Sequence, residues 1–542
     1  MHDLVIRGGT IYDGNGSDPT IEDVGIDGQM IAALAPAGTL RGKREIDAGG
    51  LAVAPGFINM LSWAVESLIE DGRSQSNIRQ GVTLEVMGEG FSMGPLNESM
   101  KAAGTRGILG NKDIQYETAW TTLGEYLDHL VKRGVSPNVA SFVGTSTLRI
   151  NAMGYEDRPP TPAELDHMCV LARQAMREGA VGLSAALIYP PASYADTAEL
   201  IAIAKVVAQH GGMYISHLRS EGSLFLEALE ELITISAQAN IRAEIYHLKA
   251  SGRSHWHKMD QVIQRVEQAQ RDGMSITADM YLYPAGGTGL NAGLPAWAHE
   301  GGDEAMLARL RDPETRERIK QEINTPSGEW ESMWQEVDSP DKMLLAGFTT
   351  DTLKPYTGMT LAEVAAIRGT SAIDTAFDLL IEDGGRIFTM YFTMSEDNIR
   401  KQVTLPWVSF CSDAESMSPE GVFLKSNPHP RAYGNFARLL GHYVRDLKLV
   451  TLQEAIRRLT SLPAHNLRIQ RRGALKVGNF ADVVAFDPNT IQDRATFAAP
   501  HQFAQGMIHV LVNGTPVISD GDHTGEKPGQ VVRGAGWTRE RG

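Results

Sequence analysis

Short apolar runs alternate with longer amphipathic stretches through the middle of the chain. The stretches at 163–178 and 223–238 repeat their apolar residues with helical spacing. The apolar runs are typical of buried strands, and we expect strands at Ala54–Met60, Thr83–Gly88, Val139–Gly144, Val181–Ala186, Met213–His217, Ala243–His247, Ser275–Tyr281 and Val408–Ser412. Strands that alternate with helices in this way predict an α/β fold, a (β/α)8 TIM-like barrel.

Both ends of the chain have a different pattern of short strands separated by turns. Residues 1–54 contain such strands, and so does the region with Ala481–Phe486 and Ile508–Thr515. Neither end is an adequate sheet alone, because a stable sheet usually needs three or more strands with a covered face. We therefore expect a small β-sandwich domain made from residues 1–54 and 475–542, and a barrel over residues 55–474.

A long interval separates the last two expected barrel strands. Residues 285–347 are rich in glycine, charge and tryptophan, which indicates an inserted subdomain or lid. The apolar run 389–393 is a candidate for an extra strand.

Composition excludes several classes of protein. Of the 542 residues, 42% are hydrophobic and 21% charged, as in a globular chain, and the net charge of −16 argues against nucleic acid as a partner. Cys169 and Cys411 form no CxxC pair, which fits a reducing compartment. The beginning of the chain lacks the apolar core of a signal peptide, and no apolar run is long enough to span a membrane. We expect a cytoplasmic protein with no membrane partner, and a homo-oligomer is compatible with the sequence.

Polar residues stand at or near the ends of five expected strands, where barrels of this type carry their chemistry. They are Glu89, His217, His247, Asp279 and Asp413. Two imidazoles and one carboxylate suit Zn²⁺ with a water in the fourth position, and a further carboxylate, Asp413, could move a proton. Each of these residues, taken alone, could instead be a hydrogen-bonded core residue, and this alternative is strongest for Asp279.

Other catalytic motifs are absent or fail in context. Residues 88–90 do not continue into a dinucleotide-binding glycine pattern, and the chain has no Walker A sequence. Residues 90–94 match GxSxG, but Pro95 disfavours the immediate helix that a nucleophile elbow needs. His255 and His257 lie in a loop beyond a strand, and we interpret them as a pocket rim or plain surface.

Several stretches of the chain closely resemble one enzyme family. Residues 182–191, 211–222, 246–252 and 412–413 are similar to the N-acyl-D-amino-acid deacylases, or D-aminoacylases, of the metal-dependent amidohydrolase superfamily. Residues 6–14 and 472–482 resemble the superfamily in general. The resemblance therefore spans nearly the whole chain.

The resemblance implies roles for individual residues. His217 and His247 match the tight zinc ligands of the fifth and sixth strands, and Asp413 matches the catalytic aspartate of the eighth. Several members have a third ligand, a cysteine in an Asn-Cys-Gly turn, where this chain has Gly88-Glu89-Gly90. Glu89 is our candidate for that ligand, since a carboxylate can replace a thiolate on zinc.

The first barrel strand departs from the superfamily. Its relatives usually have Pro-Gly-Phe-Ile-Asp, one residue and then His-x-His, whereas this chain has Asn59, Leu61 and Trp63 at the three polar positions. Leu and Trp cannot bind a metal, so the second, weaker metal site is missing and we expect one zinc ion per chain. Leu61 and Trp63 would give the substrate pocket an apolar wall, or would be ordinary core residues.

The resemblance also implies substrate-binding residues. Lys249, on the same side of its strand as His247, and Arg431 would bind a substrate carboxylate, and three tyrosines would line the pocket: Tyr189, Tyr194 and Tyr283. The alternatives are ion pairs for the two cations and packing alone for the tyrosines. Ser220 and Glu221 are either support for the ligands or plain loop residues.

We therefore expect a mononuclear zinc-dependent hydrolase that cleaves an amide bond of an N-acyl-D-amino acid, or of a related N-acylated small molecule, with a metal-activated water. One alternative is a hydrolase of the same fold that acts on another amide, an ester or a cyclic amide. Others are an inactive homologue that binds a ligand and, last, a structural interaction protein.

Overall fold

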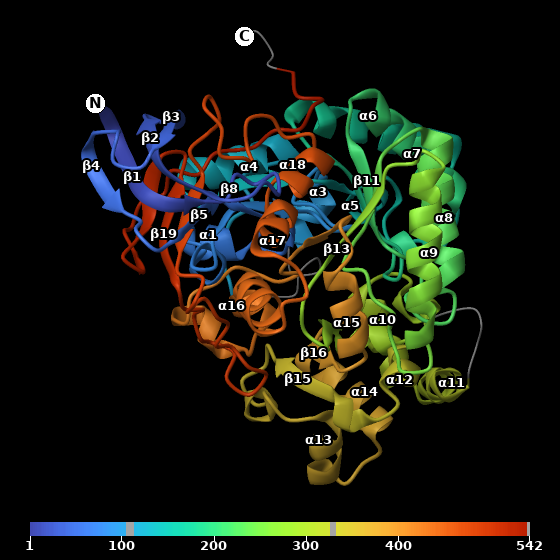
Figure 1. Ribbon diagram of the computed structural model, residues 1–542. Coiled ribbons are helices and arrows are strands. Elements are labelled where there is room, and N and C mark those ends of the chain that lie inside the picture. Colours follow the sequence, from blue (N-terminus) through green and yellow to red (C-terminus); the bar gives the residue numbers. More distant parts are fainter. Residues whose placement is uncertain (104–112, 326–331, 539–542) are drawn as a thin grey trace.

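Strands from both ends of the chain lie side by side in one sheet (Figure 1). The computed structural model describes residues 1–103, 113–325 and 332–538. Val484 pairs with Ala54, which joins the two ends of the chain. The sheet runs in the order β21-β20-β19-β18-β5-β1-β2-β3, and β4 pairs with β1. These strands are β1 (His2–Ile11), β2 (Thr20–Asp27), β3 (Met30–Pro36), β4 (Gly42–Asp47), β5 (Ala52–Pro55), β18 (Val483–Phe486), β19 (Met507–Val512), β20 (Thr515–Ser519) and β21 (Asp522–His523).

Parallel strands from residues 57–410 form the barrel. One sheet has the order β6-β7-β8 and the other β17-β13-β12-β11-β10-β9. The two meet where the backbone N–H of Asp413 donates to Leu61 and that of Trp63 to Ala414. The strands are β6 (Phe57–Ser62), β7 (Val82–Met87), β8 (Asn138–Ser141), β9 (Val143–Gly144), β10 (Gly182–Ala186), β11 (Met213–His217), β12 (Ala243–Ile245), β13 (Ile276–Met280) and β17 (Val408–Phe410). The expected barrel is confirmed.

The first expected strand, 54–60, is in fact two strands. The chain leaves the end sheet and enters the barrel at Gly56, whose N–H donates to Asp482, while the next N–H, of Phe57, donates to Gly81. A Cβ at Gly56 would lie 2.1 Å from Thr83 Oγ1, so only glycine fits this crossing. The sequence did not predict this change of sheet, because residues 54–60 form one continuous apolar run.

Helices cover the outside of the barrel, and several begin at a capping residue. Thr161 and Glu164 form a capping box at the start of α6, with Pro162 in its first turn and Gly179 at its end. The helices outside the insert are α1 (Ser67–Asp71), α2 (Gln75–Ile78), α3 (Glu98–Ala103), α4 (Leu123–Arg133), α5 (Thr145–Met153), α6 (Pro162–Glu178), α7 (Thr197–Gln209), α8 (Phe225–Ala239), α9 (Met259–Arg271), α15 (Glu396–Val403), α16 (Arg431–Arg438), α17 (Leu452–Leu459) and α18 (Ser461–Asn466).

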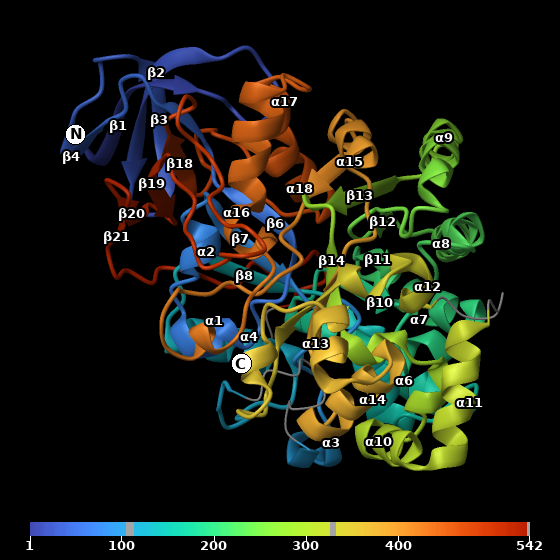
Figure 2. The same cartoon turned by 90° about the horizontal axis from the view of Figure 1, so that it is seen from below.

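The segment between β13 and α15 forms a unit with its own hydrophobic cluster, from Leu290 to Tyr391. Its small sheet includes β16, which pairs with both β14 and β15. Figure 2 shows its helices in front of the barrel strands. Its elements are β14 (Gly286–Gly289), α10 (Asp303–Arg311), α11 (Pro313–Asn324), α12 (Met333–Val337), β15 (Met343–Gly347), α13 (Leu361–Arg368), α14 (Ala372–Asp383) and β16 (Phe388–Tyr391). As domain boundaries, 54, 475 and 285–347 stay predictions.

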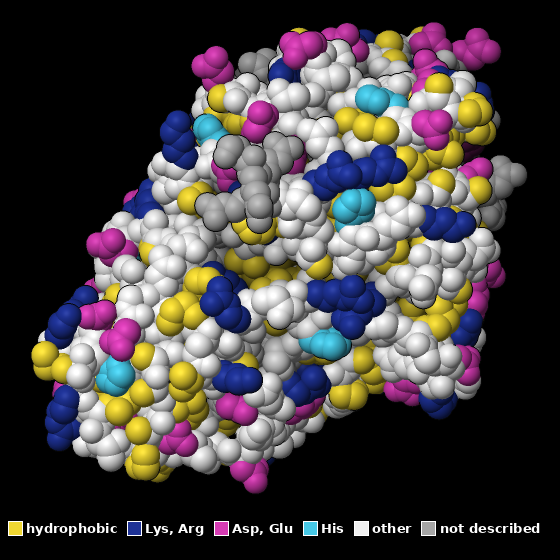
Figure 3. Space-filling model, turned by 90° about the horizontal axis from the view of Figure 1, so that it is seen from above, with side chains coloured by type: hydrophobic (Ala, Val, Ile, Leu, Met, Phe, Trp, Pro, Cys, Tyr) yellow, Lys and Arg dark blue, Asp and Glu magenta, His cyan; other side chains and the backbone are white. Residues whose placement is uncertain are grey.

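The surface carries charges of both signs. On the face seen from above, acidic side chains lie mostly toward the rim, and Lys and Arg side chains lie both across the middle and along the left edge (Figure 3). Among the described residues, no helix is both long and apolar enough to cross a membrane.

Candidate metal centre

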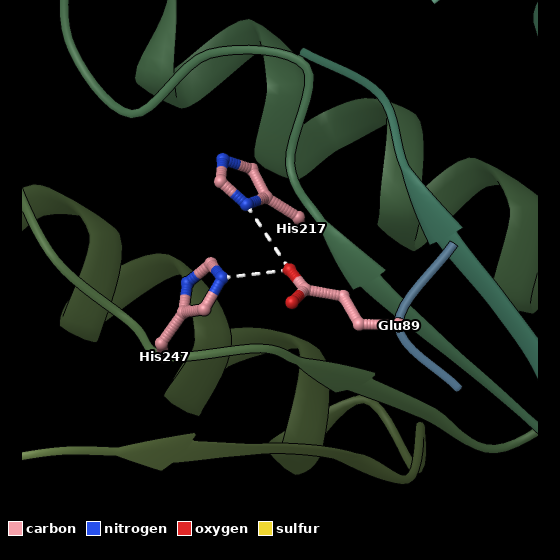
Figure 4. Close-up of side chains that lie close together, drawn as sticks. All are labelled: Glu89, His217 and His247. Atoms are coloured by element: carbon pink, nitrogen blue, oxygen red, sulfur yellow. Dashed lines mark hydrogen bonds and ion pairs between the residues drawn. The ribbon is translucent and has the colours of Figure 1, made fainter. Parts of the chain in front are cut away.

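Glu89, His217 and His247 converge at the carboxyl ends of the barrel strands (Figure 4). One possible ligand atom from each lies within 4.8 Å of the others. Glu89 Oε1 is 3.2 Å from Nδ1 of His217 and 3.0 Å from Nε2 of His247. All three side chains are buried. Residues from β7, β11 and β12 are thus brought together as strand-end geometry predicts.

The turn after β7 fixes the position of Glu89. Gly88 and Gly90 have φ values of +100° and +63°, and a Cβ on Gly88 would lie 2.5 Å from the Phe142 carbonyl oxygen. Ser184 on β10 holds both sides of the turn, because its Oγ donates to the Gly88 carbonyl and accepts the Gly90 N–H at 3.1 Å. The Gly-Glu-Gly sequence is therefore what allows Glu89 to face the two histidines.

Glu221 lies behind both imidazoles. Its Oε1 is 3.2 Å from His247 Nδ1, and its Oε2 is 3.6 Å from His217 Nε2. Each histidine therefore points one ring nitrogen at Glu89 and the other at Glu221. A carboxylate in this position orients a ligating histidine and increases its basicity.

The charges at this centre are strongly coupled. Burial alone would raise the pKa of Glu89, but His247 and His217 hold it well below its usual range. Burial and Lys249 would lower the pKa of His247, but Glu89 and Glu221 raise it to about 10. The two buried carboxylates thus favour positive charge at His247.

These donors fit a zinc ion. Two imidazole nitrogens and one carboxylate oxygen are ligands that zinc prefers, and three protein ligands leave a position for water. Nε2 of His217 is buried and has no hydrogen-bond partner among the described residues. That nitrogen faces Glu221, so the atoms that would hold the ion are the three that face one another: Glu89 Oε1, His217 Nδ1 and His247 Nε2.

Asp413 lies beside this centre with both carboxylate oxygens held. Trp63 Nε1 donates to Oδ1 at 3.1 Å, and Arg431 Nη1 lies 2.8 Å from Oδ2. Burial raises the pKa of Asp413, and the charges of Arg431 and His247 oppose that rise. The Arg431 guanidinium also lies over the ring of Tyr281, 4.3 Å from its centre.

Below the centre, Asp279 acts through the backbone. Its Oδ1 accepts the His247 N–H at 2.7 Å, and His247 has a positive φ of +33°. Burial raises the pKa of Asp279 to about 7. Asp279 therefore supports the strained turn that aims His247 and, in this structure, contributes no oxygen to the three-residue centre.

The other expected pocket residues do not all reach the site. Tyr189 packs edge-on against His217, with ring centres 5.3 Å apart. Tyr194 instead donates to Ala296 in the insert, and Tyr283 donates to Asp493 in a separate cavity. Lys249 Nζ pairs with Glu221 at 2.6 Å.

The two replaced positions of the first strand, Leu61 and Trp63, lie in different surroundings. Leu61 is fully buried in the main hydrophobic cluster, so it is core rather than a pocket wall. Trp63 lines a cavity of about 170 Å³ together with Asp413 and Arg431. Sequence reasoning did not find Tyr281 or the bond of Trp63 to Asp413; the nearest signal was the position of Trp63 in the first-strand motif.

This chain is similar to known proteins along almost its entire length. The model of the amidohydrolase family matches residues 44–518. D-aminoacylase of Alcaligenes xylosoxydans xylosoxydans is 33% identical over 535 residues, with 98% of this chain and 97% of that protein covered. An N-acyl-D-glutamate deacylase of Bordetella bronchiseptica, solved with zinc and a phosphonate inhibitor, has a TM-score of 0.81 and 29% identity over 98% of this chain and 99% of its own. A D-aminoacylase structure, described in terms of one-metal activation and second-metal attenuation at a binuclear centre, has the same TM-score and identity and covers 98% and 100%.

Proposed function

Since this chain belongs to the amidohydrolase family, we propose that it hydrolyses the amide bond of an N-acyl-D-amino acid or a related N-acylated small molecule. The observation that carries the proposal is the convergence of Glu89, His217 and His247 beside Asp413. These four residues supply a metal site and, close to it, a proton acceptor. The relatives named as a D-aminoacylase and an N-acyl-D-glutamate deacylase support the choice of substrate class.

We propose one zinc ion, held by Glu89, His217 and His247. Zinc bound there would lower the pKa of a water and polarise the substrate carbonyl. The carboxylate of Glu89 takes the place of the cysteine that several D-aminoacylases have, and it accepts bonds from both histidines in this structure. Glu221 keeps the two imidazoles turned toward Glu89.

A single metal is consistent with the first strand. Leu61 is core and Trp63 offers only an N–H donor, so neither supplies a ligand for a second ion.

Asp413 is the proposed proton carrier. It takes a proton from the attacking water and returns it to the leaving nitrogen, which would otherwise depart as a poor leaving group. Its burial supports this role, because a carboxylate with a raised pKa accepts a proton more readily than an exposed one. The positive charge of Arg431 opposes this rise in the pKa of Asp413.

The substrate carboxylate would meet positive charge on two sides. Arg431 and Lys249 both lie near Tyr281, with their cationic groups 4.3 Å and 5.9 Å from its ring centre. We propose that these two residues bind the carboxylate and that Tyr189 closes the pocket beside His217. Both cations already pair with protein carboxylates, so the substrate shares them with Asp413 and Glu221.

Two variants test the assignment. His217→Ala should lose both the metal and hydrolysis, whereas Asp413→Ala should lose hydrolysis and keep the metal, as measured by elemental analysis and turnover. Retained zinc in His217→Ala would overturn the ligand set. A panel of N-acyl-D- and N-acyl-L-amino acids, esters and cyclic amides fixes the substrate class, and turnover of only the last two would replace the proposed activity with that of another hydrolase. A metal-free wild type with no turnover would indicate an inactive ligand-binding homologue.

A further inference from the structure

We propose that Trp63 is a positioning residue for Asp413. Its indole N–H holds the carboxylate in the orientation needed for proton transfer, so the inference depends on the proposed function of Asp413. Trp63 stands where the superfamily motif has the second metal-binding histidine. In this chain a neutral hydrogen-bond donor thus replaces a ligand.

The bond itself has good geometry and a protected setting. Trp63 Nε1 lies 3.1 Å from Asp413 Oδ1, and Asp413 is only 8% exposed. An N–H that donates to a carboxylate in such surroundings is stronger than one in water, because little solvent competes for either group. The indole therefore restrains the rotation of the carboxylate.

The backbone fixes the two residues relative to each other. The Asp413 N–H donates to Leu61 at 2.9 Å, and the Trp63 N–H donates to Ala414 at 3.0 Å. These two bonds form the seam that closes the barrel between β6 and β17. These bonds fix the two backbones relative to each other, so only a change of side-chain rotamer could separate the indole from the carboxylate.

Asp413 needs such support because its backbone is strained. Its φ is +44°, a conformation that residues other than glycine rarely adopt. Arg431 holds Oδ2 at 2.8 Å, and Trp63 holds Oδ1. Among the described residues, Arg431 Nη1 has no hydrogen-bond partner, so it attracts Oδ2 by charge alone, and Trp63 supplies the directional bond that orients the carboxylate.

A metal ion is a common way to fix a carboxylate, and the D-aminoacylase structure noted above is described with a binuclear centre. Here the indole and the guanidinium are the two groups that contact the Asp413 carboxylate oxygens. Trp63 also lines the pocket, so its ring could act only as a wall. A phenylalanine at this position keeps an aromatic wall and loses the donor, which separates the two roles.

The first test is spectroscopic and needs no turnover. In protein with ¹⁵N-labelled indoles, the Trp63 N–H resonance, assigned by its loss in Trp63→Phe, should lie downfield and move upfield in Asp413→Asn, where the acceptor loses its charge. The Trp256 resonance is the matched control, because that N–H donates to the Thr393 carbonyl at 2.7 Å. If the chemical shift of the Trp63 N–H stays the same in Asp413→Asn, the proposed bond is wrong.

The second test is kinetic. Trp63→Phe should lower kcat about 10-fold or more and leave KM nearly unchanged, since a misaligned proton carrier slows the chemical step and not binding, while Trp256→Phe should change neither. A raised KM with unchanged kcat would show that Trp63 is only a wall. If the wild type turns over no substrate of the proposed class, the proposed function fails, and the indole resonance still decides whether Trp63 holds Asp413.

Discussion

Lys249 Nζ lies 2.6 Å from Glu221 Oε1, and both side chains are buried beside the two histidines. The same Oε1 is 3.2 Å from His247 Nδ1. Glu221 is therefore held as a carboxylate, because burial would raise its pKa but His217 and Lys249 hold it well below its usual range. This arrangement makes Glu221 the common support of both histidines and of the cation expected to bind substrate.

Removing the charge of Glu221 should weaken metal binding. We expect Glu221→Gln to fold and to bind zinc about 10- to 100-fold more weakly, because an amide orients and polarises the imidazoles less than a carboxylate does. Competition with a chelator measures the affinity. Glu227→Gln, at an exposed position on α8, is the control and should bind zinc as the wild type does. Equal affinity in Glu221→Gln would contradict the supporting role.

The turn that carries Glu89 should depend on Ser184. Ser184→Ala removes the two hydrogen bonds that hold Gly88 and Gly90, and it leaves buried backbone groups without a partner. We expect a loss of about 1–3 kcal/mol in the free energy of unfolding and weaker zinc binding. Denaturant unfolding and chelator competition measure the two effects.

Ser236→Ala is a suitable comparison, because the buried Ser236 Oγ on α8 donates to the Ile241 carbonyl and contacts neither the turn nor a proposed ligand. If both variants lose zinc equally, the effect does not come from the position of Glu89.

The sequence could predict the barrel and the convergence of Glu89, His217 and His247, because both depend on local patterns. Apolar runs indicate the strands. A polar residue at the carboxyl end of a barrel strand lies at the mouth of the barrel, whichever residues are its neighbours in space. Glu89, His217 and His247 needed no more than that. Tyr281 and Tyr283 show the limit: alternation assigns them to one side, but β13 ends at Met280, and Tyr283 turns away to Asp493.

Contacts across the barrel seam could not be predicted in the same way. Trp63 and Asp413 are 350 positions apart, and their bond depends on how β6 and β17 meet when the barrel closes. The change of sheet at Gly56 escaped prediction for a similar reason, because it is fixed by the approach of Thr83. Hydrophobic patterning shows which residues are buried but not which buried residues touch.

Stability should fall as the pH drops from 7.5 to 6.0, in part through His299 in the insert. Burial lowers the pKa of His299 to about 4, although its Nε2 lies 3.1 Å from the Asn291 carbonyl oxygen. The unfolded chain, with an ordinary histidine pKa near 6.5, binds the proton first. The stabilising contribution is therefore present above about pH 6.5 and is lost as the pH falls toward 4.

His299→Gln removes this titration and keeps an N–H donor for Asn291. We expect the variant to lose less stability than the wild type over this range, by up to about 1 kcal/mol. Urea unfolding at both pH values measures the difference. An identical pH dependence in the two proteins would show that His299 is not buried as a neutral side chain.

Asn59 is the last departure from the superfamily motif, which has aspartate there, and the structure explains it. Its Nδ2 donates to Glu85 Oε2 and to Ser412 Oγ, both at 2.8 Å, and its Oδ1 accepts the Ser412 N–H at 2.8 Å. Glu85 is fully buried and also accepts bonds from Ser74 and Asn77. An aspartate at position 59 would place a second carboxylate against Glu85 in the interior.

We therefore expect Asn59→Asp to destabilise the fold by about 3–5 kcal/mol, more than Asn59→Ala, although aspartate is closer to asparagine in shape. Adding Glu85→Gln to Asn59→Asp should recover much of the loss, because an amide can donate to the new carboxylate. Thermal or denaturant unfolding of the three variants measures the order. If Asn59→Asp is as stable as Asn59→Ala, charge repulsion with Glu85 is not what makes asparagine necessary at this position.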